Sequence, residues 1–148
     1  MQVLVRSVTR LNSLLRGEIS AVETYRQAIE KVKIPTARNE LAECEHSHEL
    51  RVTKLKDRVV ALGGKPSETS GAWGAFMKLV EGGATVLGDK AAIAALEEGE
   101  DRGVADYRNA LKDVEEIDPE SLSLIEQELL PAQMRTHRAM SSLKAALH

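Results

Sequence analysis

Two glutamates interrupt apolar helical stripes in this sequence, and each of them precedes a tyrosine by seven residues. The pairs are Glu18 with Tyr25 and Glu100 with Tyr107. A spacing of seven places the two side chains two helical turns apart on one face. A buried carboxylate is costly unless it is paired, protonated or bound to a metal ion. The two glutamates are therefore the first candidates for chemistry.

The two pairs belong to an internal repeat with an offset of 82 residues. Gly17–Val32, GEISAVETYRQAIEKV, returns as Gly99–Val114, GEDRGVADYRNALKDV, with seven of sixteen positions identical. Such a repeat predicts that the two segments occupy equivalent places in the fold.

A second set of candidates lies in the segment after Pro35. Glu45 and His48 are three residues apart, and we expect both on an apolar seam that also contains Val52. Carboxylate-bridged metal bundles take one Glu from each of two helices and a Glu-x-x-His pair from each of the other two. Near the carboxyl end, His137 and Gln133 are the nearest substitutes for a second pair. We expect Cys44 to be a thiol on a helix surface or at an interface.

Successive apolar residues are alternately three and four positions apart along the chain, which is typical of helices packed in a bundle. The predicted fold is all-α, with two helical hairpins joined by a long crossover. We expect one domain over residues 1–148, with helices at about 3–34, 39–62, 89–115 and 119–147 and a crossover over 63–88.

Turn and cap residues set these bounds. Pro35 is expected to end the first helix, and Gly63-Gly64 the second. Asp89 and Asp118 are expected to cap the third and fourth helices, and Pro131 to kink the fourth or open its hydrogen bonds.

The crossover is too apolar to stay in solvent. We expect it to contain a short helix over Ala72–Leu79, with Trp73 and Phe76 on one face. These two rings would cover the bundle or form an apolar patch for a second subunit, as in a homodimer.

Composition excludes several classes of protein. The chain has 148 residues, a net charge of −3 and scattered basic residues, so we expect no nucleic-acid partner. No run of 18 apolar residues occurs, and the first residues do not form a signal peptide. We therefore expect a soluble, cytoplasmic protein without membrane association. The single cysteine excludes an intramolecular disulfide.

The stretch LNSLLRGEISAVETYRQA resembles the first helix of ferritin-like proteins, especially bacterioferritins and rubrerythrins. LGGKP, the crossover and LEEGEDRGVADYRNAL resemble an uncharacterised bacterial ferritin-like family, a domain of unknown function. The resemblance implies a ferritin-like four-helix bundle with a ligand glutamate at Glu18 beside Tyr25. It places the glutamate of the first Glu-x-x-His pair at Arg51, or at His48 when aligned on LGG, and that of the second pair at Gln133.

The expected metal site is thus degenerate. Both single glutamates are present, while both Glu-x-x-His pairs are lost or displaced. The candidate ligands of iron, manganese or zinc are Glu18, Glu45, His48, Glu100 and His137. The candidate neighbours of that site are Tyr25, Tyr107, Arg51 and Gln133.

Three functions stay open on the sequence. The first is a protein of uncharacterised role with no catalytic residue, at most binding a transition metal; the glutamates would then be structural, bonded to Arg51 or His48 or sharing a proton. The second is a di-iron or di-manganese oxidase that handles O₂ or peroxide. The third is a protein-interaction module whose partner the sequence does not identify.

Overall fold

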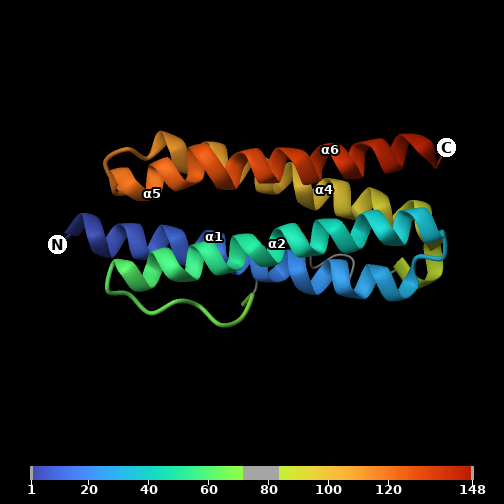
Figure 1. Cartoon of the computed structure of the whole chain (residues 1–148), viewed down its shortest axis with the longest axis horizontal. Helices are drawn as coiled ribbons and strands as arrows, with labels where there is room; N and C mark the ends of the chain where they lie inside the picture. The colour runs from blue at the N-terminus through green and yellow to red at the C-terminus, as the bar shows by residue number, and fades with distance from the viewer. Residues whose placement is uncertain (1, 72–83, 148) are drawn as a thin grey trace.

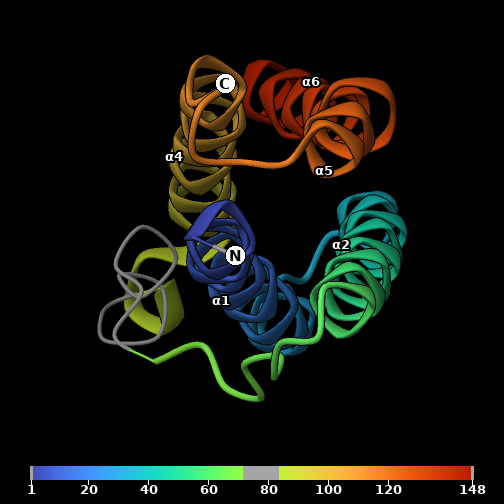
Figure 2. The same ribbon diagram turned by 90° about the vertical axis from the view of Figure 1, so that its left-hand side faces the viewer.

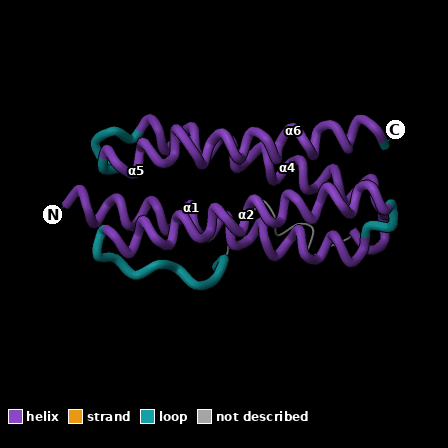
Figure 3. The backbone as a smooth tube through the Cα atoms, viewed as in Figure 1, coloured by secondary structure: helices purple, strands orange, loops and turns teal. Residues whose placement is uncertain are grey.

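The computed structural model describes residues 2–71 and 84–147, and every regular element in those ranges is a helix (Figures 1 and 3). The elements are α1 (Gln2–Lys31), α2 (Pro35–Ala61), α4 (Ala84–Lys112), α5 (Pro119–Leu124), the π-helical turn η1 (Ile125–Leu129) and α6 (Leu130–Ala146). The prediction of an all-helical bundle is therefore confirmed for the described ranges. None of these helices is both long and apolar enough to cross a membrane.

The helices form two packed pairs around a shared interior. α1 packs against α2, α4 packs against α6, and the pairs meet through α1 with α4 and α2 with α6 (Figures 1 and 2). Viewed from one end, α1, α2, α4 and α6 are arranged around a common axis (Figure 2).

One boundary prediction was wrong at the turn between α1 and α2. Pro35 begins α2 at its first position instead of lying in a turn, because a residue there needs no N–H for the helix. Asp89 accepts hydrogen bonds from the backbone N–H groups of Lys33 and Ile34, at 3.0 Å each. The helical segment that starts at Ala84 breaks at Gly88, whose φ of 83° is left-handed, and the helix that continues from Asp89 begins where it was predicted. Asp89, which belongs to the α4–α6 pair of helices, therefore stabilises the turn between α1 and α2.

The predicted stop of α2 at Gly63-Gly64 is confirmed. Gly63 has a φ of 81°, and the N–H groups of Gly63 and Gly64 donate to the carbonyls of Val60 and Val59 at 2.9 Å. This is the Schellman arrangement, which needs a left-handed residue after the helix. After this stop, Asn12 of α1 donates to the Lys65 carbonyl at 3.0 Å and accepts from the Ser67 N–H at 2.8 Å. The predicted short helix over 72–79, with Trp73 and Phe76, lies outside the described residues.

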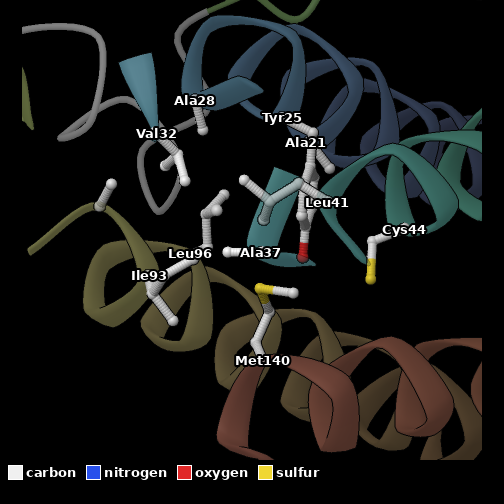
Figure 4. Packing of buried hydrophobic residues seen from close by; sticks show 11 residues of the cluster. Ala21, Tyr25, Ala28, Val32, Ala37, Leu41, Cys44, Ile93, Leu96 and Met140 are labelled. Atoms are coloured by element: carbon white, nitrogen blue, oxygen red, sulfur yellow. The ribbon is translucent and has the colours of Figure 1, made fainter. Parts of the chain in front are cut away.

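Two apolar clusters fill the interior, and a band of polar side chains separates them along every long helix. One cluster, shown in Figure 4, comprises Ala21, Tyr25, Ala28, Val32, Ala37, Leu41, Cys44, Ala92, Ile93, Leu96 and Met140. The other comprises Leu11, Leu14, Leu15, Leu55, Val59, Tyr107, Ala110, Ile117, Ile125 and Leu129. Cys44 is 3 % exposed, so the expectation of a surface thiol was wrong; burial raises its pKa to about 12.

Pro131 has the predicted effect on the last helix. Proline has no N–H and its ring disturbs the carbonyl four residues earlier, so the α-helical hydrogen bonds cannot run through it unchanged. The π-helical turn at Ile125–Leu129 lies directly before it. Ile125 and Leu129 are buried within this turn, and buried residues continue after it with Gln133, Thr136 and Met140.

The cap of α5 supports a first stability prediction. The Asp118 carboxylate accepts from the Ser121 N–H at 3.1 Å and from Arg58 at 2.9 Å. We expect Asp118→Ala to lower the free energy of unfolding by about 1–2 kcal/mol in urea titrations, because a cap is lost. Glu120→Ala removes only an exposed partner of Arg58, and we expect a loss of about 0–1 kcal/mol. Equal losses in the two variants would contradict the role of the cap.

Candidate functional site

A buried polar layer separates the two apolar clusters, and each of the four long helices contributes to it. Each of its six members is at most 4 % exposed. They are Glu18 of α1, His48 and Arg51 of α2, Glu100 of α4, and Gln133 and Thr136 of α6. Their spacing continues the three-and-four pattern of the apolar residues on either side, so the helices carry them into the interior.

His48 joins the two glutamates. Its Nδ1 is hydrogen-bonded to Glu18 Oε1, and its Nε2 lies 2.7 Å from Glu100 Oε2. An ionised carboxylate can only accept, so two such partners require a hydrogen on each ring nitrogen. Burial and the positive charge of Arg51 lower the pKa of His48, but the two carboxylates outweigh them and raise it above its ordinary 6.5. His48 is therefore an imidazolium ion bridging the two halves of the bundle.

Arg51 supplies the second positive charge of the layer. Its Nη1 lies 3.4 Å from Glu18 Oε2 and also donates to Gln133 Oε1. Its Nη2 donates to Thr136 Oγ1 at 3.1 Å and to Ser47 Oγ at 3.0 Å. Two carboxylates and two cations make the polar layer electrically neutral, which offsets much of the cost of burying each charge.

The tyrosines of the repeat are exchanged between its copies. The Tyr25 hydroxyl donates to Glu100 Oε2 at 2.5 Å, and the Tyr107 hydroxyl donates to Glu18 Oε2. Each glutamate therefore binds the tyrosine of the other copy. Burial and the adjacent carboxylate raise the pKa of both phenols well above 10, so both donate as neutral groups.

The two carboxylates are both held in the ionised form. Burial raises the pKa of Glu18, but Arg51, His48 and Tyr107 outweigh it and lower the value to about 2. Burial raises the pKa of Glu100 in the same way, and His48 is the main group that outweighs it, giving a lowered pKa. Glu100 also accepts at Oε1 from Gln133 Nε2 and from Thr136 Oγ1, each at 2.7 Å.

Most of the residues singled out in the sequence meet in this layer. Glu18, His48 and Glu100 come together, surrounded by the four predicted neighbours: Tyr25, Tyr107, Arg51 and Gln133.

Glu45 and His137 lie elsewhere. The Glu45 carboxylate binds the Arg26 Nε at 2.9 Å, and His137 Nε2 lies 2.5 Å from Asp101 Oδ1 near the surface. The placement of Glu45 on the seam was wrong by one position, because the buried face of α2 passes through Cys44 and Arg51.

Thr136 is a member of the layer that the sequence did not reveal. It links Arg51 to Glu100, accepting from one and donating to the other. Gln133 and Thr136 have the same i, i+3 spacing as a Glu-x-x-His pair, and this spacing was the available signal. Threonine is common on charged helices, so this spacing alone does not identify Thr136 as a buried member of the layer.

The donor set does not fit a divalent metal in this arrangement. Both ring nitrogens of His48 are directed at carboxylates, and a histidine ligand needs one nitrogen free of its proton. A dication beside Glu18 would also face the Arg51 guanidinium. Within residues 2–71 and 84–147, no three or more His, Cys, Asp or Glu side chains are grouped so that they could hold a metal ion.

The space beside the polar layer is small. A hollow of about 20 Å³ lies next to Glu18 and Tyr107, lined in part by Gly17, Ala21 and Gly103. This volume suits about one water molecule. It leaves no room for an organic substrate beside Glu18.

Gly103 is a position where a methyl group should be harmful. A Cβ there would overlap the amide of Gln133, which donates to both Glu100 Oε1 and the Glu100 carbonyl. Glycine to alanine in a helix interior usually stabilises by about 0.5–1 kcal/mol. We expect Gly103→Ala to destabilise by about 1–3 kcal/mol instead, measured by urea unfolding.

A second substitution, Gln133→Ser, tests whether steric overlap with Gln133 causes the destabilisation by Gly103→Ala. The shorter side chain leaves space for the methyl group, so Gly103→Ala should be less harmful in the Gln133→Ser background. An equal penalty in both backgrounds would contradict this explanation.

Comparison with known proteins places four of the six members of the polar layer inside a described family. A family model for DUF2383, a domain of unknown function, matches residues 6–113. That range carries all the ionisable members of the network, namely Glu18, Tyr25, His48, Arg51, Glu100 and Tyr107, and ends before Gln133 and Thr136. No curated protein and no solved structure gave a significant match.

Proposed function

The chain belongs to the DUF2383 family, a domain of unknown function, and we propose that it is a ferritin-like bundle whose buried polar layer is complete without a resident metal. His48 and Arg51 supply, within the protein, the positive charge that a metal pair supplies in carboxylate-bridged bundles. The observation that carries the proposal is the bridge from Glu18 through His48 to Glu100.

Helix order supports the ferritin-like part of the proposal. α2 ends at the end of the bundle where α1 begins, while α4 starts at the opposite end (Figure 1). Two hairpins whose ends lie in this order are typical of bundles with one long crossover, as in ferritin-like folds. The 82-residue repeat, with reciprocal bonds between its glutamates and tyrosines, supports a duplicated hairpin as the unit of a single domain.

In this proposal the polar layer fixes the register of the four helices. Sliding one helix by a turn, about 5 Å, would separate a buried carboxylate from its cation. Breaking a buried ion pair typically costs about 3–5 kcal/mol, because it leaves an uncompensated buried charge. The layer thus selects one axial alignment of helices whose apolar residues repeat similarly in several registers.

Metal content tests the proposal directly. We expect protein produced in medium supplemented with iron, manganese and zinc to contain far less than one bound ion per chain by elemental analysis. Two ions per chain, lost in Glu18→Ala/Glu100→Ala, would instead support the di-iron or di-manganese oxidase. One ion that depends on His48 and is inert to peroxide would support metal binding without catalysis. Either result would overturn the metal-independent function.

A matched control uses the candidate ligands outside the layer. Glu45→Ala/His137→Ala leaves all six members of the layer in place. Suppose that bound metal is lost in Glu45→Ala/His137→Ala but is retained in Glu18→Ala/Glu100→Ala. The metal then binds outside the polar layer, and the proposal stands. The predicted homodimer, the cytoplasmic location and the absence of a nucleic-acid partner stay predictions.

A further inference from the structure

The surface between the two helices of each hairpin carries a hollow, and the two hollows are related by the internal repeat. The first, between α1 and α2, has a volume of about 410 Å³ and uses four residues of α1: Ile19, Val22, Glu23 and Arg26. The second, between α4 and α6, has a volume of about 470 Å³ and uses the residues 82 positions later: Asp101, Val104, Ala105 and Arg108. Equivalent helix positions thus form both surfaces.

The two hollows differ in charge. The first contains three glutamates and two cations, a net charge of −1, and its Arg26 is bound by Glu45 at 2.9 Å and Glu49 at 3.6 Å. The second contains Asp101 and three permanent cations, a net charge of +2 with neutral histidine. These cations are Arg108, Lys112 and Arg138.

The cations of the second hollow are available to a ligand. Across the described ranges, none of the three has an ion-pair partner, and the nearby carboxylate of Asp101 is hydrogen-bonded to His137. They come from both walls, Arg108 and Lys112 from α4 and Arg138 from α6. Val104 and Met134 add apolar surface to the same lining.

We propose that the second hollow binds a small organic anion, with a carboxylate or phosphate head between Arg108 and Arg138 and an apolar body against Val104 and Met134. Guanidinium groups match both heads with paired hydrogen bonds. The volume lies within the range of roughly 300–1,000 Å³ that is common for small-molecule sites. This site lies outside the polar layer and is independent of the metal question.

Calorimetry with four eight-carbon probes tests the required chemistry. We expect octanoate or octyl phosphate to bind with one site per chain, more weakly as ionic strength rises. Octanol and octylammonium should not bind measurably. The stronger of the two anions identifies the head group. Octanol binding as tightly as the anions, or no binding by either anion, would overturn the proposal.

The repeat provides a matched control for the variants. We expect Arg108→Gln and Arg138→Gln each to weaken anion binding by roughly tenfold, because each removes a charged hydrogen bond. Arg26→Gln changes the counterpart of Arg108 in the first hollow and should leave the affinity unchanged. All three side chains are exposed, and circular dichroism checks that each variant keeps its helices. Equal weakening by Arg26→Gln and Arg108→Gln would overturn the proposed location.

Discussion

Replacing Arg51 with methionine is expected to lower the free energy of unfolding by about 3–5 kcal/mol, the largest effect of any single change considered. Arg51 is 1 % exposed and lies between Glu18, Gln133 and Thr136. Methionine keeps much of the volume but removes the charge and the donors. The polar layer is then left with two carboxylates and one cation, and the Gln133 Oε1 loses its donor.

A second variant shows whether lost charge balance is the cause. Arg51→Met/Glu18→Gln restores neutrality, and we expect it to be more stable than Arg51→Met alone in urea titrations. Arg26→Gln, which breaks an exposed pair with Glu45, should cost about 0–1 kcal/mol. An Arg51→Met protein as stable as the parent would contradict the account, as would a double variant less stable than the single one.

Stability should pass through a maximum between about pH 4.5 and 6.5. Glu18 and Glu100 have lowered pKa values in the folded protein, so their contribution is complete above the ordinary value of 4.5 and is lost as pH falls. The lowering of the Glu18 pKa to about 2 corresponds to roughly 3 kcal/mol. His48 has a raised pKa, so its contribution is complete below 6.5 and is lost as pH rises through the folded value.

Urea titrations between pH 2 and 9 would measure both limbs. At high pH a neutral His48 can donate to only one of the two carboxylates, and the bridge opens. We expect His48→Gln to remove the alkaline loss of stability while keeping the acid loss. An unchanged alkaline limb in this variant would assign that limb to another group and contradict the role of His48.

The repeat made much of the fold and of the layer predictable. It identified Glu18, Tyr25, Glu100 and Tyr107, because identical residues at one offset imply equivalent helix positions. The glycine stop after α2 followed from local backbone preference, as did the proline effect on the last helix.

Other features depend on tertiary structure and were missed. On α2 the sequence allows either Cys44 or Glu45 on the seam, since spacings of three and four are equally helical; packing decides for Cys44. Proline is allowed both in a turn and at a first helical position, so the start of α2 was placed late. The exchange of tyrosines between the repeats cannot be read from one helix at a time, because each bond joins α1 to α4.

The nitrogen NMR spectrum of the His48 ring at pH 7 tests the central claim most directly. Selective labelling of histidine, with His48→Gln used for assignment, reports whether each ring nitrogen carries a proton. We predict an imidazolium ion, with both nitrogens protonated at a pH where an ordinary histidine is mostly neutral. A neutral ring, or a ring with a metal-bound nitrogen, would contradict it.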